Sequence, residues 1–407
     1  MIGDATLYRN IGQLLTMNPL AQNQKDAFAM IPRAFLIVDQ GRVASIGSAH
    51  EEPSRWTGPV VDCGGCLISP GLVDAHTHLL YSGHRADEVA MRAKGKTYLE
   101  ILNAGGGILS TVQKTRQASD EELTYLLQQR LACALQHGST TVEVKTGYDL
   151  TVSGEYRMLQ LLRSVQNTAP TRLVSTCLAA HAVPEEYRGQ SAEYLAWLAQ
   201  ELLPKIGDLA DFVDIFCEPG VFSVEESRSY LTAAQALGFK VKLHVDELAD
   251  GHGAQLAAWL GAVSADHCAM TGQAGISAMA QAGTTAVLLP GTAGYLHHGG
   301  MPPARSMIEA NLSVAIGSDG NPGSSPTEAL SMLMPWAASW LNLLPEEVWA
   351  GVTIMGARAL ALDDRGALVP GKLADFVIWD TDDYCYPCYH YGVNLVKEVY
   401  VGGQRAM

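Results

Sequence analysis

Positive charge is scarce in this chain of 407 residues: 27 lysines and arginines stand against 42 aspartates and glutamates, a formal net charge of −15 at pH 7. A surface of this sign repels phosphate backbones, and the sequence contains no basic stripe, so nucleic acid is not expected as a partner. Charged residues make up only 17% of the chain, whereas 48% of it is hydrophobic. This composition excludes an intrinsically disordered protein and indicates a well-buried globular one.

Long apolar runs and a cysteine framework are also lacking. No stretch of about 18 apolar residues occurs, so neither a transmembrane helix nor a membrane partner is expected. The first residues do not have the basic start and apolar core of a signal peptide. Eight cysteines in a chain of this length are ordinary for a reducing compartment. We therefore expect a cytoplasmic protein.

Short apolar, β-branched runs alternate with amphipathic helical stretches through the middle of the chain. This alternation predicts parallel strands covered by helices, that is, an α/β protein. Eight units within about 300 residues favour a closed, TIM-like (β/α)8 barrel over an open doubly wound sheet. No Gly-x-Gly-x-x-Gly follows the first run, so a dinucleotide site is not expected. The predicted strands span 68–74, 140–144, 172–177, 212–217, 239–243, 262–265, 285–289 and 313–317.

Both ends of the chain carry β signals of another kind. Residues 34–47 are rich in β-formers and break at Gln40-Gly41, which is typical of a hairpin. Short strands are expected at 374–380 and 396–401. The two ends can pair into one small β domain, because chain termini often lie close together. The predicted organisation is a β-sandwich split between residues 1–66 and 364–407, with the barrel formed by residues 67–363.

Polar side chains follow five of the eight predicted strands. A single histidine at a strand end is more often a hydrogen-bonded scaffold residue, but in a barrel the C-terminal strand ends meet at one rim, where catalytic groups lie. Neutral imidazoles together with a carboxylate suit a borderline divalent metal, so the conjunction predicts a metal site. The residues expected at this rim are His76, His78, His181, His244, Glu247, Asp266, His267 and Asp319.

Two segments carry a resemblance to a known superfamily: Pro-Gly-Leu-Val-Asp-Ala-His-Thr-His at 70–78 and Gly-Lys-Leu-Ala-Asp-Phe-Val at 371–377. They resemble the amidohydrolase superfamily, whose members are metal-dependent barrels carrying a split β-sandwich. Within it the chain resembles the imidazolonepropionase family, most specifically in its Lys-Thr-Gly-Tyr and Asp-Gly-Asn-Pro-Gly segments. The similar segments cover nearly the whole chain, at 106–112, 143–148, 180–184, 264–267, 289–292, 319–326 and 389–394.

The resemblance implies an enzyme that hydrolyses a cyclic amide. The implied reaction converts 4-imidazolone-5-propanoate to N-formimino-L-glutamate, the third step of histidine degradation. It implies one metal ion per chain, zinc or iron, a small anionic substrate and a homodimer. Imidazole and carboxylate ligands suit both metals, so the sequence does not choose between them. The metal ligands implied are His76, His78, His244 and Asp319.

Catalytic roles for individual side chains are a hypothesis based on their positions at the strand ends. Asp319 is expected to take the proton of the attacking water, and Glu247 to carry a proton to the ring nitrogen that leaves. His267 is expected to orient the water or to stabilise the developing oxyanion. The implied substrate contacts are Arg85, Tyr148, His181, Glu247, Asn321, Gly323 and Ser324.

Some alternatives stay open at this point. His244-x-x-Glu247 is shared with cyclic deaminases of the same superfamily, and an inactive scaffold on this fold is a further alternative, although the implied metal ligands are all present. His84 and Asp149 depart from the family pattern beside the expected substrate contacts. The pairs Cys63-x-x-Cys66 and Cys385-x-x-Cys388 could form a structural zinc site, or they could be free cysteines.

Overall fold

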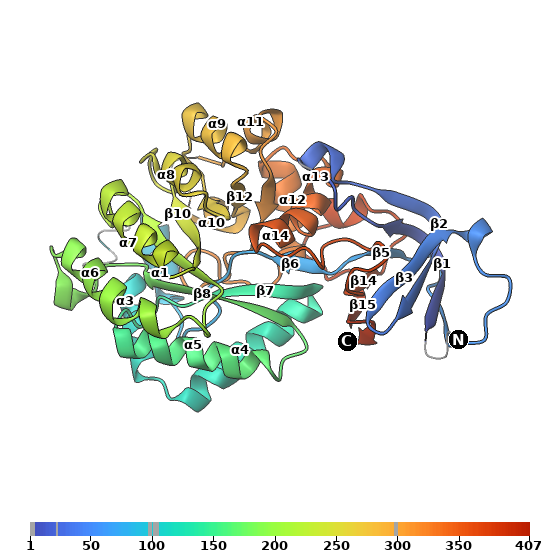
Figure 1. Cartoon of the computed structure of the whole chain (residues 1–407), viewed down its shortest axis with the longest axis horizontal. Coiled ribbons are helices and arrows are strands. Elements are labelled where there is room, and N and C mark those ends of the chain that lie inside the picture. Colours follow the sequence, from blue (N-terminus) through green and yellow to red (C-terminus); the bar gives the residue numbers. More distant parts are fainter. Residues whose placement is uncertain (1–4, 22, 97–99, 101–105, 297–299) are drawn as a thin grey trace.

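The computed structural model describes residues 5–21, 23–96, 100, 106–296 and 300–407. Eight parallel strands form a barrel at the centre of the molecule, and a second sheet built from both chain ends lies beside it (Figure 1). The predicted fold class is therefore confirmed. The barrel strands are hydrogen-bonded in sequence order: β6 (Leu72–Asp74), β7 (Ser139–Lys145), β8 (Arg172–Ala180), β9 (Phe212–Cys217), β10 (Lys240–Val245), β11 (Ser264–His267), β12 (Thr285–Leu288) and β13 (Val314–Ile316).

The barrel closes between its first and last strands, just beyond their C-terminal ends. The amide of Asp319 donates to the carbonyl oxygen of His76 at 2.9 Å, and the amide of His78 donates to that of Gly320 at 3.0 Å. Thr77 and Gly320 form a parallel bridge at the same place. The closing seam is thus made by the segments that carry three of the predicted metal ligands.

The first predicted strand, 68–74, is in fact two strands in different sheets. β5 (Leu67–Pro70) pairs with β1 (Thr6–Leu15) and β14 (Phe376–Trp379) in the terminal sheet, and β6 begins the barrel. Gly71 joins them. A Cβ atom at Gly71 would lie 2.1 Å from Oγ1 of Thr140, so only glycine allows the chain to cross between the sheets here.

Helices cover the outside of the barrel, as the alternating pattern predicts (Figure 1). Their start signals are visible in the sequence: Ser119 caps α4 by accepting the amide of Glu122, and three acidic residues fill the first turn. The α-helices are α1 (Asp87–Ala93), α3 (Ile108–Gln117), α4 (Asp120–Gln136), α5 (Val152–Gln166), α6 (Ser191–Glu201), α7 (Val224–Ala236), α8 (Gly253–Leu260), α9 (Gln273–Ala282), α10 (Pro290–Leu296), α11 (Ala304–Glu309), α12 (Leu330–Trp340), α13 (Pro345–Gly351) and α14 (Ile354–Ala359).

The terminal sheet joins residues from both ends of the chain in the order β16-β15-β14-β5-β1-β2-β3, and β4 pairs with β1. The predicted hairpin is present: Asp39 pairs with Arg42, and Gln40 and Gly41 both have positive φ. The sheet folds over a core of its own, in which the ring of Tyr8 packs edge-on against Phe376 and Tyr400. Its remaining strands are β2 (Met30–Asp39), β3 (Arg42–Ser48), β4 (Val60–Asp62), β15 (Val396–Val401) and β16 (Gln404–Arg405).

None of the helices among the described residues is long and apolar enough to cross a membrane.

Candidate active site

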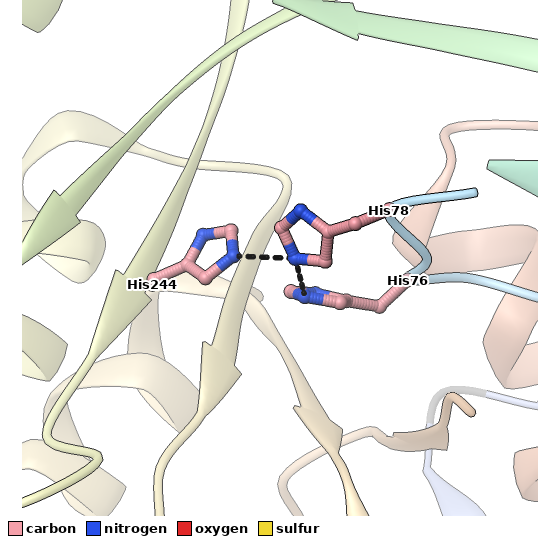
Figure 2. Close-up of side chains that lie close together, drawn as sticks. All are labelled: His76, His78 and His244. Carbon is pink, nitrogen blue, oxygen red and sulfur yellow. Dashed lines mark hydrogen bonds between the residues drawn. The ribbon is translucent and has the colours of Figure 1, made fainter. Parts of the chain in front are cut away.

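Three imidazole nitrogens meet at the C-terminal end of the barrel (Figure 2), and one carboxylate oxygen lies beside them. His76 and His78 follow β6, and His244 lies in β10, on the opposite side of the barrel. Nε2 of His78 lies 3.2 Å from Nε2 of His76 and 3.4 Å from Nε2 of His244. Asp319, which follows β13, places Oδ1 3.4 Å from Nε2 of both His76 and His78.

These spacings fit a metal ion better than they fit hydrogen bonds. Zinc bound at about 2.0–2.1 Å by tetrahedral ligands separates the ligand atoms by roughly 3.3–3.4 Å. Oδ1 of Asp319 is buried without any hydrogen-bond partner, while Thr292 donates to Oδ2 of the same carboxylate. An unsatisfied buried oxygen is costly unless a cation is bound to it. The four residues that the sequence predicts as metal ligands therefore form one site.

The electrostatic environment keeps ligand nitrogens available to a metal. Burial lowers the pKa of His78 and, more strongly, that of His244, so both rings are neutral at pH 7. A neutral imidazole offers a lone pair, which a metal requires. The backbone of Asp319 has φ of 52°, a conformation that is strained for an aspartate and common at functional sites.

Two buried carboxylates orient two of these imidazoles from the side opposite the ligand nitrogen. Oδ2 of Asp266, in β11, lies 2.7 Å from Nδ1 of His76. Oδ2 of Asp214, in β9, lies 3.0 Å from Nδ1 of His244. The hydrogen bond from His76 to Asp266 holds the proton on Nδ1 and leaves Nε2 free for the metal. The contact of His244 with Asp214 is a close ion pair without hydrogen-bond geometry. The sequence placed Asp266 at the rim without a role, and it did not identify Asp214.

Below the ligands, two lysines are fully buried inside the barrel. Nζ of Lys145 lies 2.8 Å from Asp214, 3.0 Å from Glu143 and 3.3 Å from Asp266. Nζ of Lys242 lies 2.8 Å from Glu143. Burial by itself lowers the pKa of Lys145, but the carboxylates around it raise that pKa overall, so the ammonium stays charged. Sequence reasoning missed this cluster because Glu143, Asp214 and Lys242 lie inside runs that were read as apolar strands. The charged residues within those runs were the available signal.

A cavity of about 840 Å³ opens above the ligands. All seven predicted substrate contacts line it, together with side chains that the sequence did not single out, among them Arg92 and Phe216. Most of the predicted contacts come from loops after different strands, so only the barrel brings them together. The lining set with predicted roles is Arg85, Tyr148, His181, Glu247, Asn321, Gly323 and Ser324, with His78, His244, His267 and Asp319.

One wall of the cavity carries net positive charge. Arg85 binds Glu88 through Nε at 2.8 Å and Nη2 at 3.0 Å. Arg92 also binds Glu88, at 2.8 Å, and donates to the carbonyl oxygen of Gly323 at 3.0 Å. Two guanidinium groups and one carboxylate leave a charge of +1 at this wall. This is a local field suited to an anion in a protein of net charge −15.

The loop after β13 is shaped by Asn321. Its Oδ1 accepts the amides of Gly323 and Ser324, both at 2.8 Å. A Cβ atom at position 323 would lie 2.1 Å from Nη1 of Arg85, so a glycine lets the loop backbone approach the guanidinium. Asn321 thus fixes a turn that faces the positive wall.

His181 and Tyr148 form the side of the cavity next to the metal ligands. The His181 ring stacks on His78 with centroids 4.9 Å apart and 14° between the planes. Nδ1 of His181 lies 3.1 Å from the carbonyl oxygen of Gly147, which marks it as the protonated nitrogen. Burial lowers the pKa of His181 to about 3, so the ring is neutral at pH 7 and its Nε2 is an acceptor.

Glu247 and His267 lie together on the opposite side. Nδ1 of His267 is 3.6 Å from Oε2 of Glu247, and the His267 ring lies 5.2 Å from that of His244. The segment that carries Glu247 is held by Glu218, which accepts the amides of residues 247, 248 and 249 at 2.9–3.0 Å. Glu218 is buried at the end of β9, and no sequence motif singled it out.

The two departures from the family pattern lie outside the cavity lining. His84 is exposed, and its carbonyl oxygen accepts from Lys114. Asp149 is buried and accepts the hydroxyl of Thr151 at the start of α5. The cysteine pairs do not form a metal site: within the part of the chain that the structure describes, no group of three metal-ligating atoms includes a cysteine.

Comparison with known proteins agrees with this architecture. The model of the amidohydrolase family matches residues 81–406, so the chain belongs to that family of hydrolases. Solved structures of similar fold include a triazine hydrolase variant (TM-score 0.74, 17% identity, 99% of this chain and 94% of that one) and a zinc-bound adenosine deaminase from Xanthomonas campestris (TM-score 0.69, 19% identity, 99% and 92%). Together with the histidine cluster, the family assigns a divalent metal site to the chain.

Within this family the chain belongs to the imidazolonepropionases. It is 45% identical over 408 residues to the imidazolonepropionases of Bacillus cereus strain AH187 and Bacillus anthracis strain A0248, with 98% of this chain and 96% of each relative covered. The imidazolonepropionase of Bacillus thuringiensis strain Al Hakam matches at the same identity and coverage. The resemblance found in the sequence is therefore confirmed.

Proposed function

We propose that the chain hydrolyses the cyclic amide C–N bond of 4-imidazolone-5-propanoate and releases N-formimino-L-glutamate. The observation that carries this proposal is the convergence of three imidazoles and Asp319 at the floor of a cavity whose wall bears a net positive charge. The ring needs an activated water, and the propanoate needs a cationic wall. Membership of the imidazolonepropionases supports this substrate.

The metal ligands in this proposal are His76, His78, His244 and Asp319. A bound divalent metal lowers the pKa of a water molecule and so supplies hydroxide near neutral pH. Their donor set is that of zinc or iron enzymes, and we propose that one ion of either kind is held per chain.

Proton transfer is assigned to side chains beside these ligands. Asp319 takes the proton of the attacking water, since its carboxylate lies among the ligand nitrogens. Glu247 lines the cavity and can pass a proton to the ring nitrogen that leaves, which a cyclic amide requires before its C–N bond breaks. His267, next to Glu247, orients the water or stabilises the oxyanion.

Substrate binding is assigned to the cavity wall. Arg85 pairs with the propanoate carboxylate, assisted by the backbone of Gly323 and the hydroxyl of Ser324. Neutral His181 accepts a ring N–H through Nε2, and Tyr148 packs beside it, with its ring centroid 5.4 Å from that of His181. Asn321 holds the loop in place for these contacts.

Other features of the whole protein remain predictions. We propose a cytoplasmic homodimer without nucleic-acid or membrane partners, and the division 1–66, 67–363 and 364–407. The pairing of β5 with β1 and β14 supports moving the first of these boundaries from residue 66 to Gly71.

The test is a spectrophotometric assay with freshly made imidazolonepropionate. Its ultraviolet absorbance should decay in the presence of the protein, and formiminoglutamate should be identified as the product. Ammonia released in step with turnover would instead favour a cyclic deaminase, and one neighbour of similar fold is an adenosine deaminase. No turnover in metal-loaded protein would contradict both.

A further inference from the structure

One buried ammonium contacts both of the carboxylates that orient metal-binding imidazoles. Nζ of Lys145 is 2.8 Å from Oδ2 of Asp214 and 3.3 Å from Oδ2 of Asp266. These same two oxygens lie 3.0 Å from Nδ1 of His244 and 2.7 Å from Nδ1 of His76. Each chain of contacts from the lysine thus reaches a different predicted ligand, on opposite sides of the barrel.

The remaining partner of Lys145 connects it to a second lysine. Glu143 lies 3.0 Å from Nζ of Lys145 and 2.8 Å from Nζ of Lys242. Lys242 also donates to the carbonyl oxygen of Ala75, directly before His76, at 3.1 Å. Every side chain in this cluster is fully buried. Three carboxylates and two ammonium groups give it a charge of −1, so its members cannot move apart without leaving an unpaired buried charge.

We propose that Lys145 is a positioning residue for the metal, which fixes the carboxylates of Asp214 and Asp266 and through them the rings of His244 and His76. The proposal rests on the metal site of the proposed function. Lys145 is neither one of the proposed ligands nor one of the residues that line the cavity. Its effect is to hold two imidazoles at the mutual spacing that a single ion needs.

The cluster also explains why the carboxylates below the ligands do not need a second metal ion to balance their charge. Ligand atoms of His76, Glu143 and Asp266 lie within 4.8 Å of one another, as in a cation site. The ammonium groups of Lys145 and Lys242 already lie against these carboxylates and supply the positive charge. Removing one ammonium therefore removes a resident cation as well as a contact.

The experiment measures metal affinity and coordination in Lys145→Met. Metal-free wild type and variant would compete with a chromophoric chelator for zinc, and cobalt would be bound to each for its visible absorption spectrum. Loss of a group that orients a ligand typically weakens metal binding about 10- to 100-fold. We expect a shift in the zinc Kd of this size and an altered cobalt spectrum.

Controls separate positioning from general instability. Lys242→Met removes an equally buried ammonium that pairs with Glu143 and lies 3.6 Å from Oδ2 of Asp266. It reaches one of the two orienting carboxylates and at a longer distance than Lys145 does, so we expect a smaller change in Kd. The double variant Lys145→Met with Asp214→Asn restores the cluster charge to −1, so it tests the inference if the single variant does not fold. In the Asp214→Asn background, Lys145→Met should change the zinc Kd by a smaller factor than in wild type, because the contact of Lys145 with the Asp214 carboxylate is already lost.

The inference is overturned if folded Lys145→Met and the double variant bind zinc within about twofold of wild type and give the wild-type cobalt spectrum. An equal loss of affinity in Lys242→Met would also contradict a specific role for Lys145. Wild type that binds no metal would instead refute the metal site itself, which is a separate failure.

Discussion

At the residue scale, the site is an arrangement of three imidazoles and a carboxylate around one point. The Nε2 atoms of His76 and His244 both lie within 3.4 Å of Nε2 of His78. At this distance the nitrogen lone pairs repel one another unless a cation lies between them. Burial lowers the pKa of His78 and His244 and so favours their neutral rings. Burial acts the same way on His76, but hydrogen bonds to Asp266 and Asp319 raise its pKa overall, and Asp266 fixes which of its nitrogens faces the point. The chemistry is thus prepared before any substrate enters.

Glu247→Gln tests the proton carrier. The amide cannot deliver a proton to the leaving nitrogen, so kcat should fall about 10²- to 10⁴-fold. Glu247 is not among the proposed ligands, so bound metal measured by mass spectrometry should remain near one ion per chain. Loss of the metal together with the activity would contradict this division of roles.

Arg85→Ala tests the anion wall. Loss of a charge-assisted pair to a carboxylate is worth about 1.5–3 kcal/mol, so KM should rise at least about tenfold. Metal content should be unchanged. Arg163→Ala, on the exposed face of α5, is the matched control and should leave KM unchanged. An unchanged KM in Arg85→Ala would remove this residue from the site.

At the scale of elements, buried acidic side chains hold the loops that carry the functional residues. Glu155 accepts the amides of residues 147, 149 and 150 and so fixes the segment of Tyr148. Glu218 does the same for the segment of Glu247, and Glu88 holds Arg85. A rigid strand end and a buried acceptor together determine where each loop points.

Glu218→Gln tests this support. The glutamine amide replaces one acceptor oxygen by a donor, so kcat should fall while metal content stays the same.

Burial raises the pKa of Glu218 to about 7 from 4.5. Between these values the native state binds more protons than the unfolded state, so this group lowers wild-type stability as pH rises. The free energy of unfolding of wild type should therefore fall relative to that of the variant from about pH 4.5 to pH 7.

Urea unfolding of both proteins at several pH values measures this difference, and Glu225→Gln, an exposed residue of α7, serves as the control. A stability difference that does not vary with pH in this window would contradict the burial argument for Glu218.

The sequence predicted the barrel and the functional residues at its rim, but it did not predict the buried charges below them or the break between the two sheets. Strand ends were informative because the C-terminal rim of a barrel collects polar groups, as for Asp319. Asp214 was read as part of an apolar strand, and Lys145 only as part of a family segment, because only the closed barrel shows that the two side chains face one another. The division of 68–74 into β5 and β6 was missed because the whole segment was read as one strand, although Pro70-Gly71 in its middle marks the break.

At the scale of the whole molecule, the terminal sheet and the barrel share the crossing at Gly71. The Cβ of Gly71→Ala would lie 2.1 Å from Oγ1 of Thr140, so the variant should lose about 1–3 kcal/mol of stability. Gly207→Ala is a suitable comparison, since no atom lies within 4 Å of a Cβ there and its backbone does not have a positive φ. A Gly71→Ala protein as stable as wild type would show that the sheets can shift apart.

The net charge of −15 bears on how the substrate is attracted to the protein. It argues against nucleic acid, yet the proposed substrate is itself an anion, so long-range attraction does not recruit it. In the proposed function, recognition instead depends on the local charge of a bound metal and of Arg85 and Arg92, which line the same cavity or lie beside it.

The most direct test of the account is metal titration of the stripped enzyme. Chelated protein should not consume imidazolonepropionate, and added zinc or iron(II) should restore ring opening in proportion, saturating at one ion per chain, with formiminoglutamate as the product. Full activity in protein shown to be metal-free, or saturation only at two ions per chain, would contradict the single metal site at His76, His78, His244 and Asp319.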